Sequence, residues 1–194
     1  MVIAHHLMWT LYGWWLTNDP RGSTSQTIRN DILKELGELH FGRKRIQPTG
    51  KEVRSFYESA GSKLKYDLLT ISPNDFTTVA RTFETSIRSC GYACYALAIM
   101  PGHVHLVIRK HKDHAETMIE NLQELTREQI IDLGLRPTDH PVWTQGGYKV
   151  FLDTPDDVWR TIRYVDDNPV KQRLPRQSWD FVAPYDNWPH HKTR

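Results

Sequence analysis

The sequence is poor in cysteine, with only Cys90 and Cys94 among 194 residues. One pair cannot build the disulfide framework of a small secreted domain, and no second pair is present to complete a zinc site. We therefore expect both thiols to be ordinary, reduced core residues. This scarcity excludes the disulfide-rich and zinc-finger classes.

Long apolar runs are also lacking. The apolar stretch at residues 3–16 is interrupted by His5, His6, Thr10 and Gly13, and no run reaches the roughly 18 residues that suggest a membrane-spanning helix. The same stretch has neither the basic segment nor the small-residue cleavage site of a signal peptide. The sequence thus predicts a cytoplasmic protein with no membrane partner.

Neither sign of charge dominates the chain. Lys and Arg number 25 against 23 Asp and Glu, so the formal net charge is only +2. Any surface for nucleic acid must therefore be a local patch. With 39% hydrophobic residues and neither an internal repeat nor a low-complexity tract, residues 1–194 fit one globular domain.

The spacing of apolar residues predicts a mixture of strands and helices. Strands are expected at residues 6–16, 66–71, 92–99, 103–109 and 148–152. Helices are expected at 27–39, at about 53–64, after the Ser72-Pro73 start signal, at 115–133 and at 155–168. The first two helices form an insertion at about 24–65.

Without this insertion, and with 66–71 counted as the lead-in to its helix, the order is β-α-β-β-α-β followed by one more helix. That order is typical of an α+β fold, a ferredoxin-like antiparallel sheet with helices on one face. The additional C-terminal helix would then lie outside the basic unit.

Chemistry concentrates in His103-Val104-His105. Side chains alternate along a strand, so residues i and i+2 project from one face and both imidazoles can reach one ion. Imidazole nitrogens suit Mn²⁺ or Zn²⁺, and with oxygen donors added such a site also accepts Mg²⁺. The alternative is two half-exposed polar residues on a strand, which this short pattern alone does not exclude.

Two longer strings carry a resemblance to a known family. Residues 100–107 read MPGHVHLV and residues 164–171 read YVDDNPVK, with VWTQ at 142–145 between them. Together they resemble the metal-binding and tyrosine motifs of the HUH single-strand DNA transposases, especially the REP-associated tyrosine transposases. The sequence departs from that pattern at Gly102, where asparagine is common, and the segment from 24 to 65 matches nothing in the family.

The resemblance implies that Tyr164 is the nucleophile on a C-terminal catalytic helix, and that His103, His105 and Asn168 bind a divalent metal, Mg²⁺ or Mn²⁺. It also implies a single-stranded, hairpin-bearing DNA substrate, a 5′-phosphotyrosine intermediate and a free 3′-hydroxyl. A homodimer remains an open possibility for the assembly.

The residues of the second motif support this interpretation on physical grounds. Arg160, Tyr164 and Asn168 are spaced at i, i+4 and i+8, which aligns a cation, a phenol and an amide along one helix face. Alternatives remain for two of them. Asn168 precedes Pro169 and could instead cap the helix end, and Tyr164 could be an ordinary amphipathic tyrosine.

Other residues compete for these roles. Tyr148 is the rival nucleophile, although its place in a short strand favours packing or base stacking. His5 and His6 are adjacent, so only one of them can face inward from a strand. Basic residues that could contact DNA phosphates lie in the insertion, near the end of the second strand of the hairpin and on the last helix. They are Arg43, Lys44, Arg45, Arg109, Lys110, Arg160 and Lys171.

Three function classes follow from these observations. The first is a metal-dependent enzyme that nicks and rejoins single-stranded DNA during transposition. The second is a protein that binds hairpin DNA but has lost cleavage. The third is an unrelated metal-dependent hydrolase, which needs no tyrosine and forms no covalent adduct.

Overall fold

The computed structural model describes residues 1–23, 39, 42 and 45–189. Its centre is a sheet of four antiparallel strands, β1 (Ala4–Thr10), β2 (Cys94–Ile99), β3 (His103–Arg109) and β4 (Tyr148–Leu152), in the order β2-β3-β1-β4. Helix α3 (Phe76–Cys90) connects β1 to β2, and α4 (Ala115–Asp132) connects β3 to β4. This is the predicted α+β fold with ferredoxin-like strand order.

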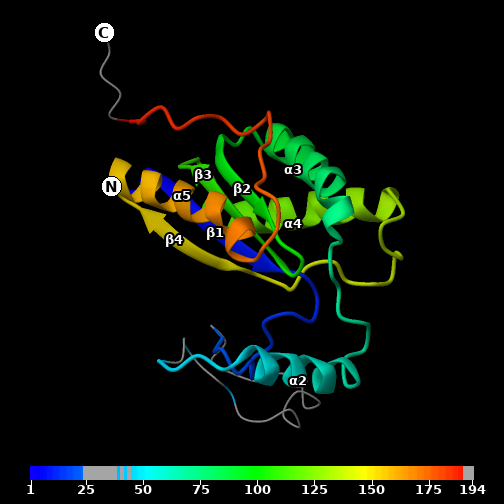
Figure 1. Cartoon of the computed structure of the whole chain (residues 1–194). Coiled ribbons are helices and arrows are strands. Elements are labelled where there is room, and N and C mark those ends of the chain that lie inside the picture. Colours follow the sequence, from blue (N-terminus) through cyan, green and yellow to red (C-terminus); the bar gives the residue numbers. More distant parts are fainter. Residues whose placement is uncertain (24–38, 40–41, 43–44, 190–194) are drawn as a thin grey trace.

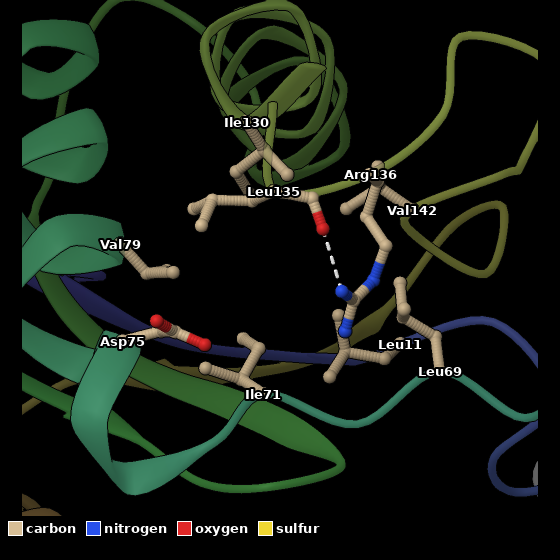
Figure 2. A pocket seen from close by; sticks show the side chains of 9 residues that line it. All are labelled: Leu11, Leu69, Ile71, Asp75, Val79, Ile130, Leu135, Arg136 and Val142. Atoms are coloured by element: carbon tan, nitrogen blue, oxygen red, sulfur yellow. Dashed lines mark hydrogen bonds between the residues drawn. The ribbon is translucent and has the colours of Figure 1, made fainter. Parts of the chain in front are cut away.

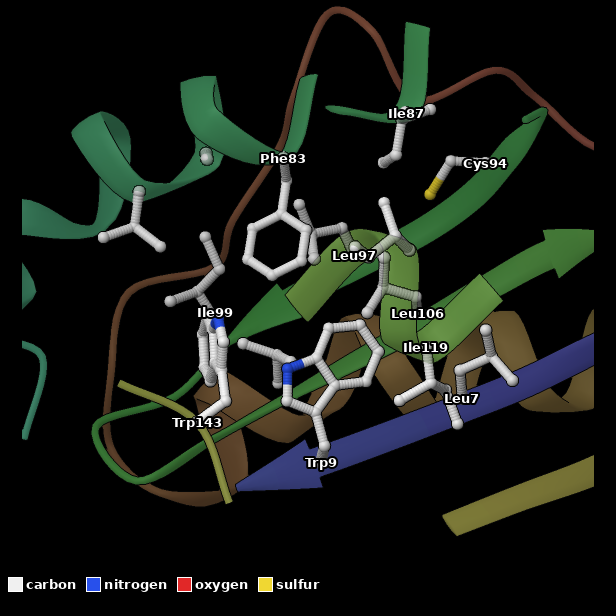
Figure 3. Packing of buried hydrophobic residues seen from close by; sticks show 14 of the residues in the cluster. Leu7, Trp9, Phe83, Ile87, Cys94, Leu97, Ile99, Leu106, Ile119 and Trp143 are labelled. Atoms are coloured by element: carbon white, nitrogen blue, oxygen red, sulfur yellow. The ribbon is translucent and has the colours of Figure 1, made fainter. Parts of the chain in front are cut away.

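Helices cover both faces of the sheet (Figure 1). Helices α3 and α4 pack on one face, where Trp9 of β1, Phe83 of α3 and Trp143 meet with ring centroids about 6 Å apart (Figure 3). Helix α5 (Pro155–Lys171) crosses the opposite face and buries Val158, Ile162 and Val165 against it. The predicted extra C-terminal helix therefore covers the face of the sheet that α3 and α4 leave open.

Local sequence signals account for the start of α5. The Thr154 side chain accepts a hydrogen bond from the Asp157 backbone N–H, and Pro155 occupies the first helical position. Asp156 and Asp157 lie in the first turn, where the helix dipole favours negative charge.

The helix was expected to end at Asn168, and that boundary is wrong, because α5 continues to Lys171 with Pro169 inside it. Pro169 has no backbone N–H, so one helical hydrogen bond is missing. Because Pro169 lies in the last turn, the helix ends soon after this gap. The Gln172 N–H closes the turn by donating to the Asn168 and Pro169 carbonyls at 3.3 and 3.0 Å.

The predicted strand at 66–71 does not form. This segment makes single hydrogen bonds to loops instead of a ladder, from the Leu69 N–H to the Tyr12 carbonyl (3.1 Å) and from the Ile71 N–H to the Pro101 carbonyl (2.9 Å). The first strand also ends at Thr10 and not at residue 16, because Gly13 and Trp15 have φ values of 82° and 55° that an extended strand cannot contain.

The structure describes part of the segment at 24–65, which the sequence predicts to be an insertion. Helix α2 (Gly50–Gly61) confirms the second predicted helix, and it lies beside the chain that follows β1 (Figure 1). Thr49 and Glu52 form a capping box at its start. The first predicted helix, at 27–39, lies outside the described residues apart from position 39.

The segment after α5 runs along the open edge of β2. The Gln177 amide pairs with both backbone groups of Ile99, accepting from N–H at 2.8 Å and donating to the carbonyl at 2.7 Å. Further along, the Trp179 indole donates to the Leu97 carbonyl (3.1 Å) and the Ala183 N–H donates to the Cys94 carbonyl (2.9 Å). These bonds occupy backbone groups that an edge strand would otherwise leave unpaired.

Cys90 and Cys94 are unpaired thiols, as predicted. Cys94 is buried, and burial raises the pKa of its thiol to about 12, which leaves it unreactive. Across the described part of the chain, every helix is too short or too polar to cross a bilayer.

Candidate metal and nucleophile site

Two histidines at the start of β3 lie on the face of the sheet that α5 covers. The turn before them is closed by the Met100 N–H, which donates to the His103 carbonyl at 2.8 Å. Because β3 alternates, Val104 and Leu106 enter the core beneath α3 and α4 while His103 and His105 point the other way. The two imidazole centroids are 4.9 Å apart, so the predicted pair is close enough to share one ion.

A third imidazole joins this pair from the neighbouring strand. His6 Nε2 lies 3.0 Å from His105 Nδ1, with the ring centroids 5.2 Å apart and the ring planes 21° apart. The two nitrogens are much closer together than the two ring centres, so the rings meet edge to edge and lie in nearly one plane. This is the geometry of an N–H···N hydrogen bond.

His6 is therefore the member of the adjacent pair that faces the site, which the sequence alone did not decide. His5 points to the other face, where it contacts Phe151 with centroids 5.5 Å apart. The signal was available in principle, because alternation on β1 and β3 predicts which residues share a face once the two strands are known to be neighbours.

All three imidazoles of this cluster are neutral near pH 7. Burial lowers the pKa of His6 to about 4, and burial together with the positive charge of Arg21 lowers the pKa of His103 to about 4. Burial holds the pKa of His105 well below its usual value, with smaller contributions from the two neighbouring imidazoles. A neutral imidazole offers a lone pair, which is the state that binds a metal.

Tyr164 stands over this cluster on α5. Its ring centroid lies 5.9 Å from that of His6 and 5.8 Å from that of His105, both edge-on. The side chain is 46% exposed, so a substrate can approach the phenol while the ring borders the histidines. The Lys171 ammonium lies 5.1 Å from the centroid of the same ring and brings a positive charge beside it.

Tyr148 lies further from the histidines. It pairs with Met8 of β1, which in turn pairs with His105, so a whole strand separates the two residues. Its side chain is 47% exposed. Of the two candidate nucleophiles, Tyr164 is the one with ring contacts to the cluster.

Asn168 follows Tyr164 by one turn and is largely buried. Its Nδ2 donates to the Tyr164 carbonyl at 3.0 Å, so the amide does not cap the turn at Pro169. Within the part of the chain that the structure describes, Oδ1 accepts no hydrogen bond. This arrangement leaves the amide oxygen of Asn168 available as a metal ligand one turn from Tyr164.

The donor set fits a divalent ion only if an amide or water joins the imidazoles. Among the described residues, no three His, Cys, Asp or Glu side chains are arranged to hold one ion. His6 does not supply the third ligand, since its Nε2 is directed at His105. The nitrogens of His103 and His105 with the Asn168 oxygen make a mixed set that Mn²⁺ or Mg²⁺ accepts.

The predicted DNA-binding cations are spread over the molecule, and only some lie near the cluster. Lys171 lies beside Tyr164, and Arg160 is exposed one turn earlier on α5, paired with Asp157. Arg45 is exposed on the segment before α2. Arg43 and Lys44 lie outside the described residues.

Arg109 and Lys110 lie at the opposite end of β3, about 20 Å along the strand from His103 at the usual rise per residue. Arg109 stacks on the Trp188 ring, with its guanidinium carbon 4.0 Å from the ring centroid. The structure therefore separates these two cations from the candidate site.

A small pocket lies elsewhere, on the α3 and α4 side of the sheet (Figure 2). Arg136 lies at its edge and donates to the Leu135 carbonyl at 2.6 Å. Its lining contains none of the predicted site residues. The lining residues are Leu11, Leu69, Ile71, Asp75, Val79, Ile130, Leu135, Arg136 and Val142.

No family model and no curated protein matches the chain. Two solved structures are similar to it at low identity. A REP-associated tyrosine transposase bound to a REP hairpin is 11% identical with a TM-score of 0.47, over 92% of this chain and 74% of that one. A candidate transposase from Deinococcus radiodurans R1 is 10% identical with a TM-score of 0.40, over 90% and 92%. At these values, function has to be argued from the residues of the site.

Proposed function

We propose that this protein is a transposase-like nuclease that nicks and rejoins single-stranded DNA through Tyr164. The observation that carries the proposal is the approach of the Tyr164 ring to both His6 and His105, with Asn168 one turn away. The two sequence strings that resemble the HUH motifs supply His105, Tyr164 and Asn168, and the fold adds His6. Sequence resemblance and spatial arrangement thus support one site independently.

In the proposed reaction the Tyr164 phenolate attacks a DNA phosphorus. The new bond joins Oη to phosphorus, and the bond from phosphorus to the 3′-oxygen breaks. The phenol proton passes to solvent, and the departing 3′-oxygen takes up a proton to leave a 3′-hydroxyl. The 5′-phosphotyrosine conserves the phosphodiester bond, so a later 3′-hydroxyl can reverse the step, whereas water would end it as hydrolysis.

His103, His105 and Asn168 are the residues that would hold Mg²⁺ or Mn²⁺. When bound, such an ion polarises the scissile phosphate and stabilises charge on its oxygens. The protein contributes neutral imidazoles, a fixed amide and a half-exposed phenol on one rigid helix. Lys171 adds a positive charge beside the Tyr164 ring, where the phosphate would have to approach.

The proposed substrate is single-stranded DNA that bears a hairpin near the cleavage site, as the resemblance implies. Arg160 and Lys171, on the helix that carries Tyr164, are the described cations best placed to contact its phosphates, and Arg45 is a further exposed cation before α2. Arg109 and Lys110 could act only on DNA that extends to the far end of β3.

A hairpin-binding protein without cleavage is the alternative that shares this fold. Retention of both histidines, Tyr164 and a neighbouring Asn168 argues against it, because binding alone requires none of them. An unrelated hydrolase would use the histidines without a tyrosine, and the contacts of Tyr164 with the histidine cluster argue against that.

The decisive experiment is a denaturing gel with a DNA hairpin labelled on the 3′ side of the nick. The wild-type protein should carry the label covalently, because a 5′-phosphotyrosine retains that fragment. Tyr164→Phe keeps the ring and its packing but removes the attacking oxygen, so the adduct should vanish.

Tyr148→Phe is the matched control, since it removes the hydroxyl of a tyrosine of similar exposure on the same face of the sheet. This variant should still form adduct. Adduct that persists in Tyr164→Phe but disappears in Tyr148→Phe would reverse the assignment, and cleavage without any adduct would favour the hydrolase.

A further inference from the structure

A second polar cluster lies beside His103, on the chain that leaves β1. At its centre, the Arg21 guanidinium makes a two-point ion pair with Asp19, from Nε to Oδ1 at 2.9 Å and from Nη2 to Oδ2 at 2.7 Å. Asp19 is fully buried, whereas the Arg21 side chain is 27% exposed. The carboxylate therefore anchors the guanidinium from beneath and leaves part of it open to solvent.

Helix α2 completes the cluster through Tyr57. Its buried hydroxyl donates to Asp19 Oδ2 and accepts from Arg21 Nη2 at 3.1 Å. The same oxygen accepts from the Trp15 backbone N–H at 2.7 Å. One hydroxyl from the insertion thus fixes the position of both the arginine and the segment that carries it.

Trp15 links this cluster to the histidines. The Arg21 guanidinium carbon lies 4.5 Å from the centroid of the Trp15 ring, and the same ring meets His103 edge-on with centroids 5.7 Å apart. Trp15 has a φ of 55°, a left-handed conformation that a bulky residue adopts only when its surroundings enforce it. The surrounding contacts hold this backbone so that one indole lies between the arginine and a proposed metal ligand.

The free donors of Arg21 show what this cluster can bind. Nε and Nη2 are used by Asp19 and Tyr57, while Nη1 has no hydrogen-bond partner within the described ranges. A fixed, partly exposed guanidinium with N–H groups to spare is suited to a phosphate oxygen. Because Asp19 balances its charge, the expected effect is directional and local, and not a long-range attraction.

We propose that Arg21 is a DNA-binding residue that holds a phosphodiester next to the one at His103 and His105, and that α2 is retained to fix this arginine. The inference rests on the proposed function, since it assumes single-stranded DNA at the histidine cluster. It assigns a role to α2, which lies in the segment at 24–65 that matches nothing in the family resembled by the sequence.

The test measures the affinity of the full chain for a fluorescent single-stranded DNA at several salt concentrations. Arg21→Gln alone would remove the ion pair of the buried Asp19 carboxylate and could unfold the protein. Asp19→Asn/Arg21→Gln removes both charges together and is the variant to use. Arg54→Gln is the matched control, because Arg54 is an exposed arginine on α2 itself.

The double variant should bind DNA about tenfold more weakly, as expected for loss of one charge-assisted contact. The slope of log K against log [salt] should fall by less than about 0.7, the value for one phosphate of a single strand, because the variant removes the charge of Asp19 together with that of Arg21. Tyr57→Phe removes the hydroxyl that fixes Arg21 but keeps the charges of Arg21 and Asp19, so it should lower the affinity for DNA by a smaller factor. Arg54→Gln should change neither quantity.

Equal affinities and slopes in wild type, the double variant and Arg54→Gln would overturn the role of Arg21. Adduct formation, read in the same samples, separates this outcome from failure of the proposed function. Wild-type protein that forms a Tyr164-dependent adduct while the double variant binds normally would contradict the Arg21 inference alone. Absence of adduct in wild type would instead contradict the proposed function. The affinities and their salt dependence would still show whether Arg21 contacts a DNA phosphate.

Discussion

His6 and His105 are joined across β1 and β3 by a hydrogen bond of 3.0 Å between Nε2 of the first and Nδ1 of the second. One of the two neutral rings must donate and the other accept. If His105 donates from Nδ1, its Nε2 carries the lone pair that a metal needs. His6 would then act on the metal through His105, by fixing its tautomer and orientation.

This relationship predicts that His6 can be replaced only by another hydrogen-bond acceptor. His6→Leu should weaken Mn²⁺ binding about tenfold or more, because the outer partner of a ligating histidine typically contributes that much. His6→Gln can place an amide oxygen near the position of Nε2 and should recover most of the affinity. The measurement is Mn²⁺ titration by electron paramagnetic resonance.

His5→Leu is the control for this prediction, since His5 is equally buried but lies on the opposite face. It should leave Mn²⁺ affinity unchanged. Equal losses in the His5 and His6 variants would indicate a general packing effect and contradict the positioning role.

The proposed ligands give a second prediction. His103→Ala and His105→Ala should each abolish cleavage of hairpin DNA while most DNA affinity survives, because the cations that contact phosphates are retained. A chelator should reproduce the loss in wild-type protein, and added Mn²⁺ should reverse it. Undiminished cleavage by either variant would contradict the assignment of the ligands.

The uneven placement of the cations gives a third prediction. Lys171→Gln should weaken single-stranded DNA binding and lower the salt slope by about 0.7, since this ammonium lies beside Tyr164. Lys110→Gln removes the same charge at the far end of β3 and should have a smaller effect. Similar losses would mean that the DNA covers the whole length of the strand.

The turn before the histidines gives a fourth prediction. A Cβ added at Gly102 would lie 2.8 Å from Trp14 Cδ2 and 2.9 Å from Cε2, closer than real contacts allow. Gly102→Ala should therefore destabilise the protein by about 1–3 kcal/mol, the usual cost of overpacking. Urea unfolding measures this loss.

Gly61→Ala is the matched control, because a Cβ there meets no atom within 4 Å. It should be neutral or slightly stabilising, as alanine favours helix over glycine. Combining Gly102→Ala with Trp14→Leu should recover part of the stability in a double-mutant cycle. Strict additivity of the two changes would contradict the steric explanation.

The basic fold could be predicted because its elements are short and strongly patterned. The short strand predicted at 148–152 matches β4 to the residue, and helical spacing placed α4 within one residue of its observed end. The predictions were wrong where tertiary contacts override local pattern. The segment at 66–71 has the composition of a strand, but it borders loops and finds no strand to pair with.

The site residues also fall into those that local pattern predicts and those that depend on tertiary contacts. His103, His105 and Tyr164 could be proposed from two short strings, because each string places its residues on one strand or one helix face. His6 and Arg21 could not, since their significance depends on which strands are neighbours and on where α2 docks. Such relations between distant segments leave no periodic signal in one sequence.

The contact between Gly102 and Trp14 ties the turn before the histidines to a distant part of the chain. Asparagine is common at the position of Gly102 in the resembling family, and here the space that such a side chain needs is taken by an indole that also packs on Tyr57 of α2 with centroids 4.9 Å apart. A relative with asparagine at that position should therefore carry a smaller residue in place of Trp14. Trp14 thus joins the turn before the histidines to α2, so that a change of side chain at any of these three places would be felt at the other two.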